Sequence, residues 1–281
     1  MYEVDSIKKL LREYREGKVS DEELVSALTS LLLVKNLNTV KLDVNRDLRV
    51  GFPEIIYGPG KKYDDIRNSA LAMLQSRGRV FIYGLAGEYK SRLINDLGLD
   101  LNKYIIKEAN NLLLIKDKEL LNNNENEREK IGRVALLTGG TVDVPYAEET
   151  ALILEELGVE VFKYYDVGVA NLNRVLEALS DVIKHGIDLI IVFAGMDGVL
   201  PVVTASIVPI PVIGVPISSG YGFGGNGNAA LMTMLQSCVP GLVVVNINNT
   251  VGAAAAAYRI LLTINKRLTN MKGNEQVKMY E

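Results

Sequence analysis

Cys238 and Asp197 are the two side chains whose types and settings could do chemistry in this sequence. Cys238 is the only cysteine and lies in the segment Ser237-Cys238-Val239-Pro240-Gly241. Asp197 lies in Gly195-Met196-Asp197-Gly198 and is the last charged residue before an uncharged stretch, residues 198–258. A thiolate is a nucleophile, and a carboxyl group in a partly dry loop favours its protonated form and can act as an acid or a base. We therefore predict that Asp197 has an acid or base function, whereas these observations leave the role of Cys238 open.

Cys238 also admits another interpretation. A lone cysteine is typical of a small buried hydrophobe. Cys238 moreover follows an expected helix, and the negative end of the helix dipole opposes formation of a thiolate. The thiol would therefore need activation by a base or by a cationic substrate.

The uncharged stretch of residues 198–258 is too long to be a solvated surface. It must be buried core, a subunit interface or the lining of a pocket. It contains a glycine-dense loop, residues 218–227, which a core does not require. We therefore expect a pocket together with an interface between copies, and we predict a homo-oligomer.

The elements that must position these residues follow a regular alternation in the second half of the chain. Short apolar runs bounded by glycine or polar residues alternate with segments of helical spacing. This pattern predicts a parallel sheet covered by helices on both faces, a three-layer αβα fold of the flavodoxin-like kind. The expected strands are residues 134–137, 159–164, 188–193, 212–215 and 242–246, and the expected helices are residues 146–157, 171–185, 200–207, 228–237 and 251–267.

The first half of the chain predicts a smaller α+β domain, residues 1–121. Two helices lead in, at residues 5–15 and 20–31, the second with a Ser-x-x-Glu capping box. Next we expect a strand at 55–57, a helix at 62–75 and a strand at 79–83. The pattern from there to residue 118 is compatible with either helix or strand. We expect an Asn- and Glu-rich linker at 122–130, a catalytic domain at 131–269 and a loose tail at 270–281.

Polar and glycine-rich residues follow one expected strand after another. Because ligands bind beyond the carboxyl ends of parallel strands, these loops should form one site. Backbone N–H groups at the helix starts would bind phosphate there. Asp143 could cap the following helix or contact the ligand. The candidate substrate-binding residues are Gly139, Gly140, Thr141, Asp143, Gly168, Gly195, Gly198, Ser218, Gly220, Tyr221 and Gly222.

Composition excludes several classes of function. The net charge of −3 argues against a nucleic-acid partner. One His and one Cys rule out a Cys/His zinc site and an internal disulfide within one chain. His185 stands before Gly186 at an expected helix end, where a C-cap role suits it. We expect a cytoplasmic protein without a signal peptide or a membrane span.

Five segments together resemble the LarB family, the carboxylase/hydrolase of nickel-pincer nucleotide cofactor synthesis. The family's C-terminal half is similar to PurE, the phosphoribosylaminoimidazole carboxylase or mutase. Residues 49–61 also resemble the family's N-terminal region. The five segments are Gly140-Thr141-Val142-Asp143-Val144-Pro145, Asp166-Val167-Gly168-Val169-Ala170, Ala194-Gly195-Met196-Asp197-Gly198-Val199-Leu200-Pro201, Gly220-Tyr221-Gly222 and Ser237-Cys238-Val239-Pro240-Gly241.

The resemblance implies a reaction. Nicotinic acid adenine dinucleotide would be carboxylated by carbon dioxide or bicarbonate, and its phosphoanhydride hydrolysed, to give pyridinium-3,5-biscarboxylic acid mononucleotide and AMP. Cys238 would add to the pyridinium ring and Asp197 would move the ring proton, so both must reach one ligand. The resemblance also implies a divalent metal, Mg²⁺, held mainly by substrate phosphate and water, and an octamer as in PurE-like families. No metal ligands can be named from the sequence.

Three residues depart from the family's usual pattern. Asp197 stands where the family usually has Glu, Val142 where it usually has Ser, and Asn173 where it usually has His. Two alternatives to the carboxylase/hydrolase therefore stay open: a PurE-type aminoimidazole ribonucleotide carboxylase or mutase, which has no use for Cys238, and a nucleotide-binding protein without turnover. In the N-terminal domain, Arg49, Glu54 and Lys61 could form a lid or a substrate clamp, or have a structural role.

Overall fold

The computed structural model describes residues 2–32, 35–37, 40–100, 102–118 and 130–278, and the chain divides into two units, Met1–Glu127 and Arg128–Glu281. The expected linker at 122–130 falls on residues outside the described part, apart from Lys130. Each unit has a sheet and a hydrophobic core of its own.

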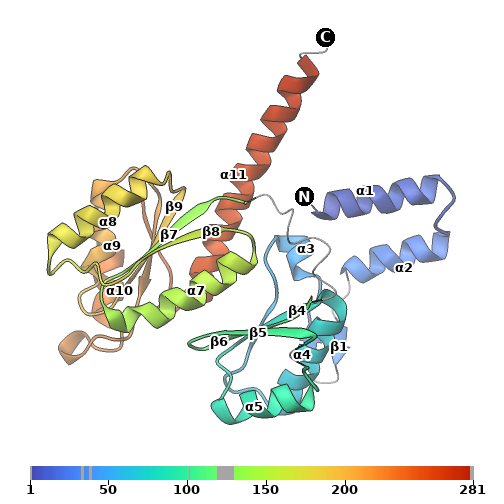
Figure 1. The fold of residues 1–281 in the computed structure, drawn as a ribbon, viewed down its shortest axis with the longest axis horizontal. Helices are drawn as coiled ribbons and strands as arrows, with labels where there is room; N and C mark the ends of the chain where they lie inside the picture. Colours follow the sequence, from blue (N-terminus) through green and yellow to red (C-terminus); the bar gives the residue numbers. More distant parts are fainter. Residues whose placement is uncertain (1, 33–34, 38–39, 101, 119–129, 279–281) are drawn as a thin grey trace. The chain divides into compact units, whose positions relative to one another are not determined.

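The second unit is built on a five-stranded sheet with the strand order β11-β10-β9-β7-β8, in which every neighbouring pair is parallel (Figure 1). The central strands β9 and β10 are buried along their whole lengths, as expected for uninterrupted apolar runs covered on both faces. The structure therefore confirms the predicted parallel α/β fold. The strands are β7 (Arg133–Thr138), β8 (Glu160–Tyr164), β9 (Leu189–Ala194), β10 (Val212–Pro216) and β11 (Leu242–Val244).

Five helices cover the two faces of this sheet. Helices α8, α9 and α10 contribute buried side chains to one hydrophobic cluster with the strands, whereas α7 packs against α11 (Figure 1). Each helix begins at the carboxyl end of a strand, so the helix starts and the strand ends meet at one edge of the sheet. The helices are α7 (Val144–Glu156), α8 (Leu172–Lys184), α9 (Val199–Ile207), α10 (Asn228–Leu235) and α11 (Thr250–Lys278), with a short 3-10 turn at Thr141–Asp143 and another at Gly222–Gly224.

The C-terminal helix is longer than expected. The sequence predicts a loose tail from residue 270, but α11 continues through Lys278. The added residues contain no proline, and Gly273 lowers helix propensity by only about 1 kcal/mol, which does not end a helix that has already been nucleated. Among the described helices, none is both long and apolar enough to cross a membrane.

The first unit holds a four-stranded mixed sheet of order β3-β4-β6-β5, in which β3 and β4 are parallel and the other pairs antiparallel. Helix α4 packs against this sheet, and β1 and β2 form a separate antiparallel pair. The stretch that the sequence left undecided contains α5 and the β5–β6 hairpin. The elements are α1 (Tyr2–Arg15), α2 (Asp21–Leu32), β1 (Lys35–Leu37), β2 (Val40–Leu42), α3 (Arg46–Val50), β3 (Ile55–Tyr57), α4 (Tyr63–Arg77), β4 (Arg79–Tyr83), α5 (Gly87–Asp96), β5 (Tyr104–Ala109) and β6 (Leu112–Asp117).

Candidate active site

Glycines allow the loops at the carboxyl edge of the parallel sheet to approach one another closely. A Cβ atom at Gly168 would lie 2.4 Å from the carbonyl oxygen of Gly139, so the first and second loops touch through their backbones. A Cβ atom at Gly195 would lie 2.0 Å from the hydroxyl oxygen of Ser219, which brings the third and fourth loops together in the same way. Real Cβ atoms do not approach other atoms so closely. The predicted convergence of the four loops is therefore present in the structure.

Asp143 is the polar centre of these loops. Its side chain is 4% exposed. Its Oδ2 accepts a hydrogen bond from the Gly140 backbone N–H at 3.0 Å, and its Oδ1 accepts one from the Ser219 hydroxyl at 3.0 Å. Burial raises the pKa of Asp143 above its ordinary value, and the hydrogen bonds from Gly140, Ser219 and Gly195 offset part of that rise. The carboxylate thus joins the first loop to the third and fourth.

The capping role considered for Asp143 is not what the structure shows. Asp143 occupies the N-cap position of α7, but its side chain makes no hydrogen bond to the first turn of that helix. The carboxylate turns back to Gly140 and across to Ser219 instead. The backbone N–H groups at the start of α7 are therefore not used by this side chain.

The second loop is fixed by a buried threonine and brings a cation to the edge of the sheet. The hydroxyl oxygen of Thr138, a fully buried residue, accepts a hydrogen bond from the Asp166 backbone N–H at 3.0 Å. Asp166 in turn accepts from Arg174, in the first turn of α8, at 2.9 Å through Oδ2 and at 3.1 Å through its carbonyl oxygen. Arg174 is exposed and was not singled out from the sequence. Its position three residues after Asn171, the N-cap of α8, was the available signal.

A fifth loop, after β11, also belongs to the site and was missed from the sequence. Asn248 accepts a hydrogen bond from the Ser218 backbone N–H at 2.9 Å and donates one from its amide to the Ser218 hydroxyl at 2.8 Å. It thereby fixes the residue at which the glycine-dense loop begins. The same rule that located the other loops would have located Asn248, because it follows the last strand of the sheet.

Strained backbone gathers in these loops. Among the described residues other than glycine, five have a positive φ, and four of these, Asp166, Met196, Asn226 and Asn248, lie in loops after strands of the parallel sheet. Such conformations cost of order 1–3 kcal/mol each and persist where the surroundings enforce them. Their clustering agrees with a functional site at this edge.

Asp197 lies at this edge but is not in the dry setting considered for it. Its side chain is exposed, and its Oδ1 accepts a hydrogen bond from the Val199 backbone N–H at 3.3 Å at the start of α9. The neighbouring Gly198 has a φ of +65°, and a Cβ atom there would lie 2.6 Å from the Ala230 carbonyl oxygen. The loop that holds Asp197 is therefore held against α10, while the carboxylate itself points to solvent within one copy.

Cys238 lies at the other end of the sheet. It is exposed and follows the end of α10, four residues before β11 begins. The strand register places Leu242, the first residue of β11, level with Val212 and Ile190. Ile190 is four residues before Ala194, the last residue of β9, which corresponds to about 13 Å along the strands. Cys238 therefore belongs to the amino edge of the sheet.

The structure does not bring Cys238 and Asp197 together within one copy of the chain. Asp197 follows β9 at the carboxyl edge, whereas Cys238 precedes β11 at the amino edge. The strand directions alone imply this separation, because both strands are parallel.

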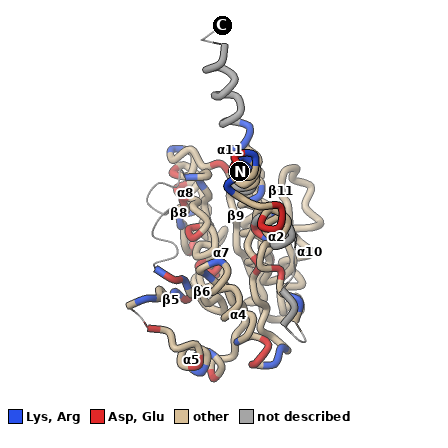
Figure 2. Tube along the Cα trace, turned by 90° about the vertical axis from the view of Figure 1, so that its right-hand side faces the viewer, with Lys and Arg blue, Asp and Glu red and all other residues tan. Residues whose placement is uncertain are grey.

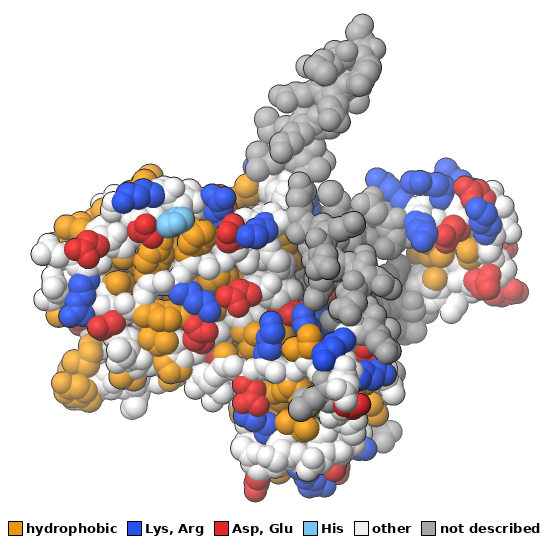
Figure 3. Space-filling model, in the orientation of Figure 1, with side chains coloured by type: hydrophobic (Ala, Val, Ile, Leu, Met, Phe, Trp, Pro, Cys, Tyr) orange, Lys and Arg blue, Asp and Glu red, His pale blue; other side chains and the backbone are white. Residues whose placement is uncertain are grey.

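The glycine-dense loop carries its candidate residues outward. Tyr221 is 80% exposed, the neighbouring Phe223 is fully exposed, and hydrophobic side chains gather at the tip that this loop forms (Figure 3). Thr141, Val142 and Asn173 are also exposed. Residues 218–235, which include α10, carry no charge, and the tube at α10 is tan in Figure 2. Further exposed apolar side chains along the uncharged stretch are Met232, Leu235 and Val243.

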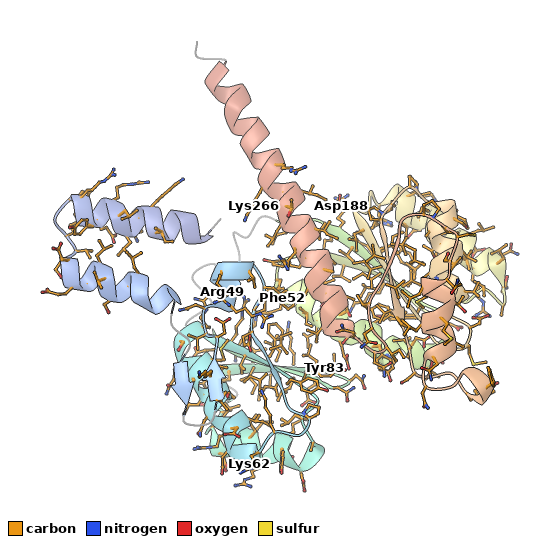
Figure 4. The ribbon with its side chains drawn as sticks, turned by 180° about the vertical axis from the view of Figure 1, so that it is seen from behind. Arg49, Phe52, Lys62, Tyr83, Asp188 and Lys266 are labelled. Carbon is orange, nitrogen blue, oxygen red and sulfur yellow. The ribbon has the colours of Figure 1, made fainter. Side chains whose placement is uncertain are left out.

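Two of the candidates in the first unit, Arg49 and Glu54, have structural partners. Arg49 lies on α3 (Figure 4). It pairs with Asp43 at 2.5 Å, and Glu54 pairs with Arg46 at 2.8 Å. These pairs favour the structural interpretation of Arg49 and Glu54, whereas Lys61 is exposed. His185 is the C-cap of α8, as predicted.

No group of three or more His, Cys, Asp or Glu side chains among the described residues could hold a metal ion. The exposed carboxylates at the carboxyl edge, Asp166 and Asp197, stand apart on separate loops. Oxygen ligands for a hard cation at this edge would therefore come mainly from a bound substrate and water.

Comparison with known proteins gives two domain matches. Residues 133–280 match the AIR carboxylase family, and residues 34–93 match the LarB/PurE-like N-terminal domain. An uncharacterized protein of Methanocaldococcus jannaschii is 39% identical over 93% of this chain and 99% of its own length. The N5-carboxyaminoimidazole ribonucleotide mutase of Pyrococcus horikoshii is 37% identical over 46% of this chain and 71% of its own, and the mutase of M. jannaschii is 32% identical over 52% and 92%.

Proposed function

This chain belongs to the LarB family, with a LarB/PurE-like N-terminal domain before an AIR carboxylase domain, and we propose that it carboxylates a nucleotide-bound pyridinium ring. The AIR carboxylase domain indicates a carboxylase- or mutase-type enzyme. The specific reaction that we propose uses nicotinic acid adenine dinucleotide. Carboxylation of its ring and hydrolysis of its phosphoanhydride would give pyridinium-3,5-biscarboxylic acid mononucleotide and AMP.

The observation that carries this choice is the accessible thiol of Cys238. The aminoimidazole ring on which such a mutase acts is electron-rich. Its carboxylation therefore needs no nucleophile from the protein. The matches to the named mutases also cover only about half of this chain. M. jannaschii has both a mutase and a separate relative that matches this chain over nearly its whole length, which supports distinct functions for the two.

The chemistry explains why a thiol is needed. A pyridinium ring is electron-poor and cannot attack carbon dioxide. Addition of the Cys238 thiolate to a ring carbon forms a C–S bond and gives a neutral dihydropyridine, whose enamine carbon then attacks carbon dioxide. A base removes the proton from that carbon, the C–S bond breaks, and the electron pair leaves with sulfur, which restores the aromatic cation. We assign the proton transfer to Asp197.

The positions of the two residues add a requirement to this proposal. Cys238 and Asp197 lie at opposite edges of one sheet, so a ring at the carboxyl edge would receive the thiol from a second copy of the chain. The exposed apolar side chains at Tyr221, Phe223 and Leu235 would be covered in such an assembly. We therefore propose a homo-oligomer, an octamer as in PurE-like families, with sites shared between copies.

The phosphate groups of the substrate would lie on the loops at the carboxyl edge. Arg174 supplies a guanidinium group there, whose five N–H donors suffice for both Asp166 and a phosphate. The positive charge of the pyridinium ring would stabilise the thiolate. A bound Mg²⁺ would neutralise charge on the phosphate oxygens during hydrolysis.

The sequence identity between this chain and the named mutases supports one other candidate function, that of a PurE-type carboxylase or mutase. Activity assays of the purified protein with the substrates of the two reactions, each offered separately, distinguish the two functions. With nicotinic acid adenine dinucleotide, bicarbonate and Mg²⁺, the proposal predicts AMP and a mononucleotide with one added carboxyl group. Conversion of aminoimidazole ribonucleotide with bicarbonate, or of N5-carboxyaminoimidazole ribonucleotide without it, would establish a PurE-type reaction if nicotinic acid adenine dinucleotide is not converted. Binding of the nucleotides without turnover would indicate a binding protein.

A further inference from the structure

Glu149 is a fully buried carboxyl group on α7 that the proposed reaction does not use. Its side chain is 0% exposed, and it lies in the second turn of the helix that begins beside Asp143. A carboxyl group in a protein interior is unfavourable unless hydrogen bonds satisfy it. The partners of Glu149 therefore indicate what the group does.

One hydrogen-bond partner of Glu149 is Thr250, the first residue of the C-terminal helix. The Thr250 hydroxyl donates a hydrogen bond to Glu149 Oε2 at 2.5 Å. The adjacent Thr150 hydroxyl donates to the Thr250 carbonyl oxygen at 3.2 Å. Both threonines are 0% exposed. Side chains of α7 thus bind both the hydroxyl group and the backbone carbonyl oxygen of Thr250.

Thr250 in turn fixes Asn248. The Thr250 backbone N–H donates to the Asn248 carbonyl oxygen at 3.0 Å, and the Asn248 N–H donates to the Pro216 carbonyl oxygen at 2.9 Å. Asn248 has a φ of 55°, a strained conformation that its surroundings must maintain. The Asn248 side chain then holds both the backbone N–H and the hydroxyl of Ser218.

These contacts form a closed circuit. Ser219, the residue after Ser218, donates to Asp143, which directly precedes α7. The circuit therefore runs from α7 through Thr250, Asn248 and the start of the glycine-dense loop back to α7. Residues 218–227 of that loop include five glycines and have little conformational preference of their own.

We propose that Glu149 is a positioning residue, which holds Thr250 and Asn248 in place and thereby fixes the start of the loop of residues 218–227 over the site. In this proposal the effect of Glu149 on the substrate is indirect and passes through Ser218, Ser219 and Asp143. The consequence for turnover rests on the proposed function, whereas the consequence for the loop does not.

Hydrogen–deuterium exchange on the full-length protein without substrate tests the contact chain independently of any reaction. We expect Glu149→Ala to speed exchange of peptides covering residues 217–227 by about tenfold, because a hydrogen bond to a buried carboxyl is lost. Glu149→Gln should stay near wild type, because its amide oxygen can still accept from Thr250. Glu156→Ala is the matched control: Glu156 is a buried carboxyl on the same helix, at its far end.

The result that overturns the proposal is equal exchange of residues 217–227 in Glu149→Ala and in Glu156→Ala, whether both are fast or both unchanged. If Glu149→Ala does not fold, Thr250→Val takes its place. This variant keeps the shape of the side chain and removes only the donor to Glu149, and it should loosen the same peptides, whereas unchanged exchange would overturn the proposal. In an active enzyme, Glu149→Gln should restore the kcat/KM that Glu149→Ala loses.

Discussion

Cys238 and Asp197 lie at opposite edges of the five-stranded sheet within one copy of the chain, because Cys238 precedes β11 and Asp197 follows β9 in a parallel arrangement. The register places the first residue of β11 about 13 Å before the carboxyl end of β9. If both residues act on one ring, two copies must build each site.

Mixing two inactive variants tests this shared site. Cys238→Ala and Asp197→Asn should each be inactive alone, whereas oligomers assembled from both should regain part of the activity, because some sites receive an intact thiol from one copy and an intact carboxylate from another. The two variants would be co-expressed with different affinity tags, and carboxylation would be measured on oligomers purified through both tags. Mixed oligomers that are as inactive as the parents would show that the two residues do not share a site in this way.

The Arg174 guanidinium should bind substrate phosphate. We expect Arg174→Gln to raise KM by roughly tenfold to a hundredfold, since a charge-assisted hydrogen bond is worth about 1.5–3 kcal/mol. Lys184→Gln is the matched control, because Lys184 is an exposed cation in the last turn of the same helix. Equal effects of the two substitutions on KM would contradict a role of Arg174 in binding substrate phosphate.

The contact between the first and second loops depends on the absence of a side chain at Gly168. Gly168→Ala would place a Cβ atom 2.4 Å from the Gly139 carbonyl oxygen, so the backbone must shift. We expect a loss of about 1–3 kcal/mol in the free energy of unfolding, measured by denaturant titration. Gly87→Ala, at a glycine with no atom within 4 Å of the added Cβ, should leave stability nearly unchanged. A Gly168→Ala variant as stable as this control would contradict the close approach of the loops.

The buried Asp143 makes stability depend on pH. Burial raises its pKa above the ordinary value of 3.8, so the folded protein holds this proton more tightly than the unfolded chain. That contribution is fully present below the ordinary pKa and is lost as the pH rises through the raised one. The melting temperature of Asp143→Asn relative to wild type should therefore rise with pH over this window. A difference between the two proteins that does not vary with pH would speak against the raised pKa.

The elements of the second unit could be predicted because fully buried parallel strands are unbroken apolar runs. The β5–β6 hairpin could not, because the β6 segment Leu112–Asp117 is apolar at first and charged at its end, although all of it is buried. The helical tail was not predicted, because the polar residues after 269 are as compatible with coil as with helix.

The loops of the site were predictable from strand ends, but the hydrogen bond between Ser219 and Asp143 joins residues 76 positions apart. No local pattern encodes such a contact.

The position of Cys238 at the amino edge of the sheet was predictable from the sequence. A residue that precedes a parallel strand lies at the amino edge, away from the loops that bind ligands. The resemblance to a family implies a chemical role for the thiol but does not place the thiol relative to the sheet. Glu149 gave no signal at all, because a glutamate inside a helix is usually solvated.

The most direct test of the account follows labelled bicarbonate into the pyridine ring. Wild-type protein, nicotinic acid adenine dinucleotide, Mg²⁺ and ¹³C-bicarbonate should yield AMP and a mononucleotide that carries ¹³C in a second ring carboxyl group, detected by NMR and mass spectrometry. Cys238→Ala should incorporate no label while still binding the dinucleotide. Full incorporation by Cys238→Ala would contradict the central claim that a protein thiol activates the ring.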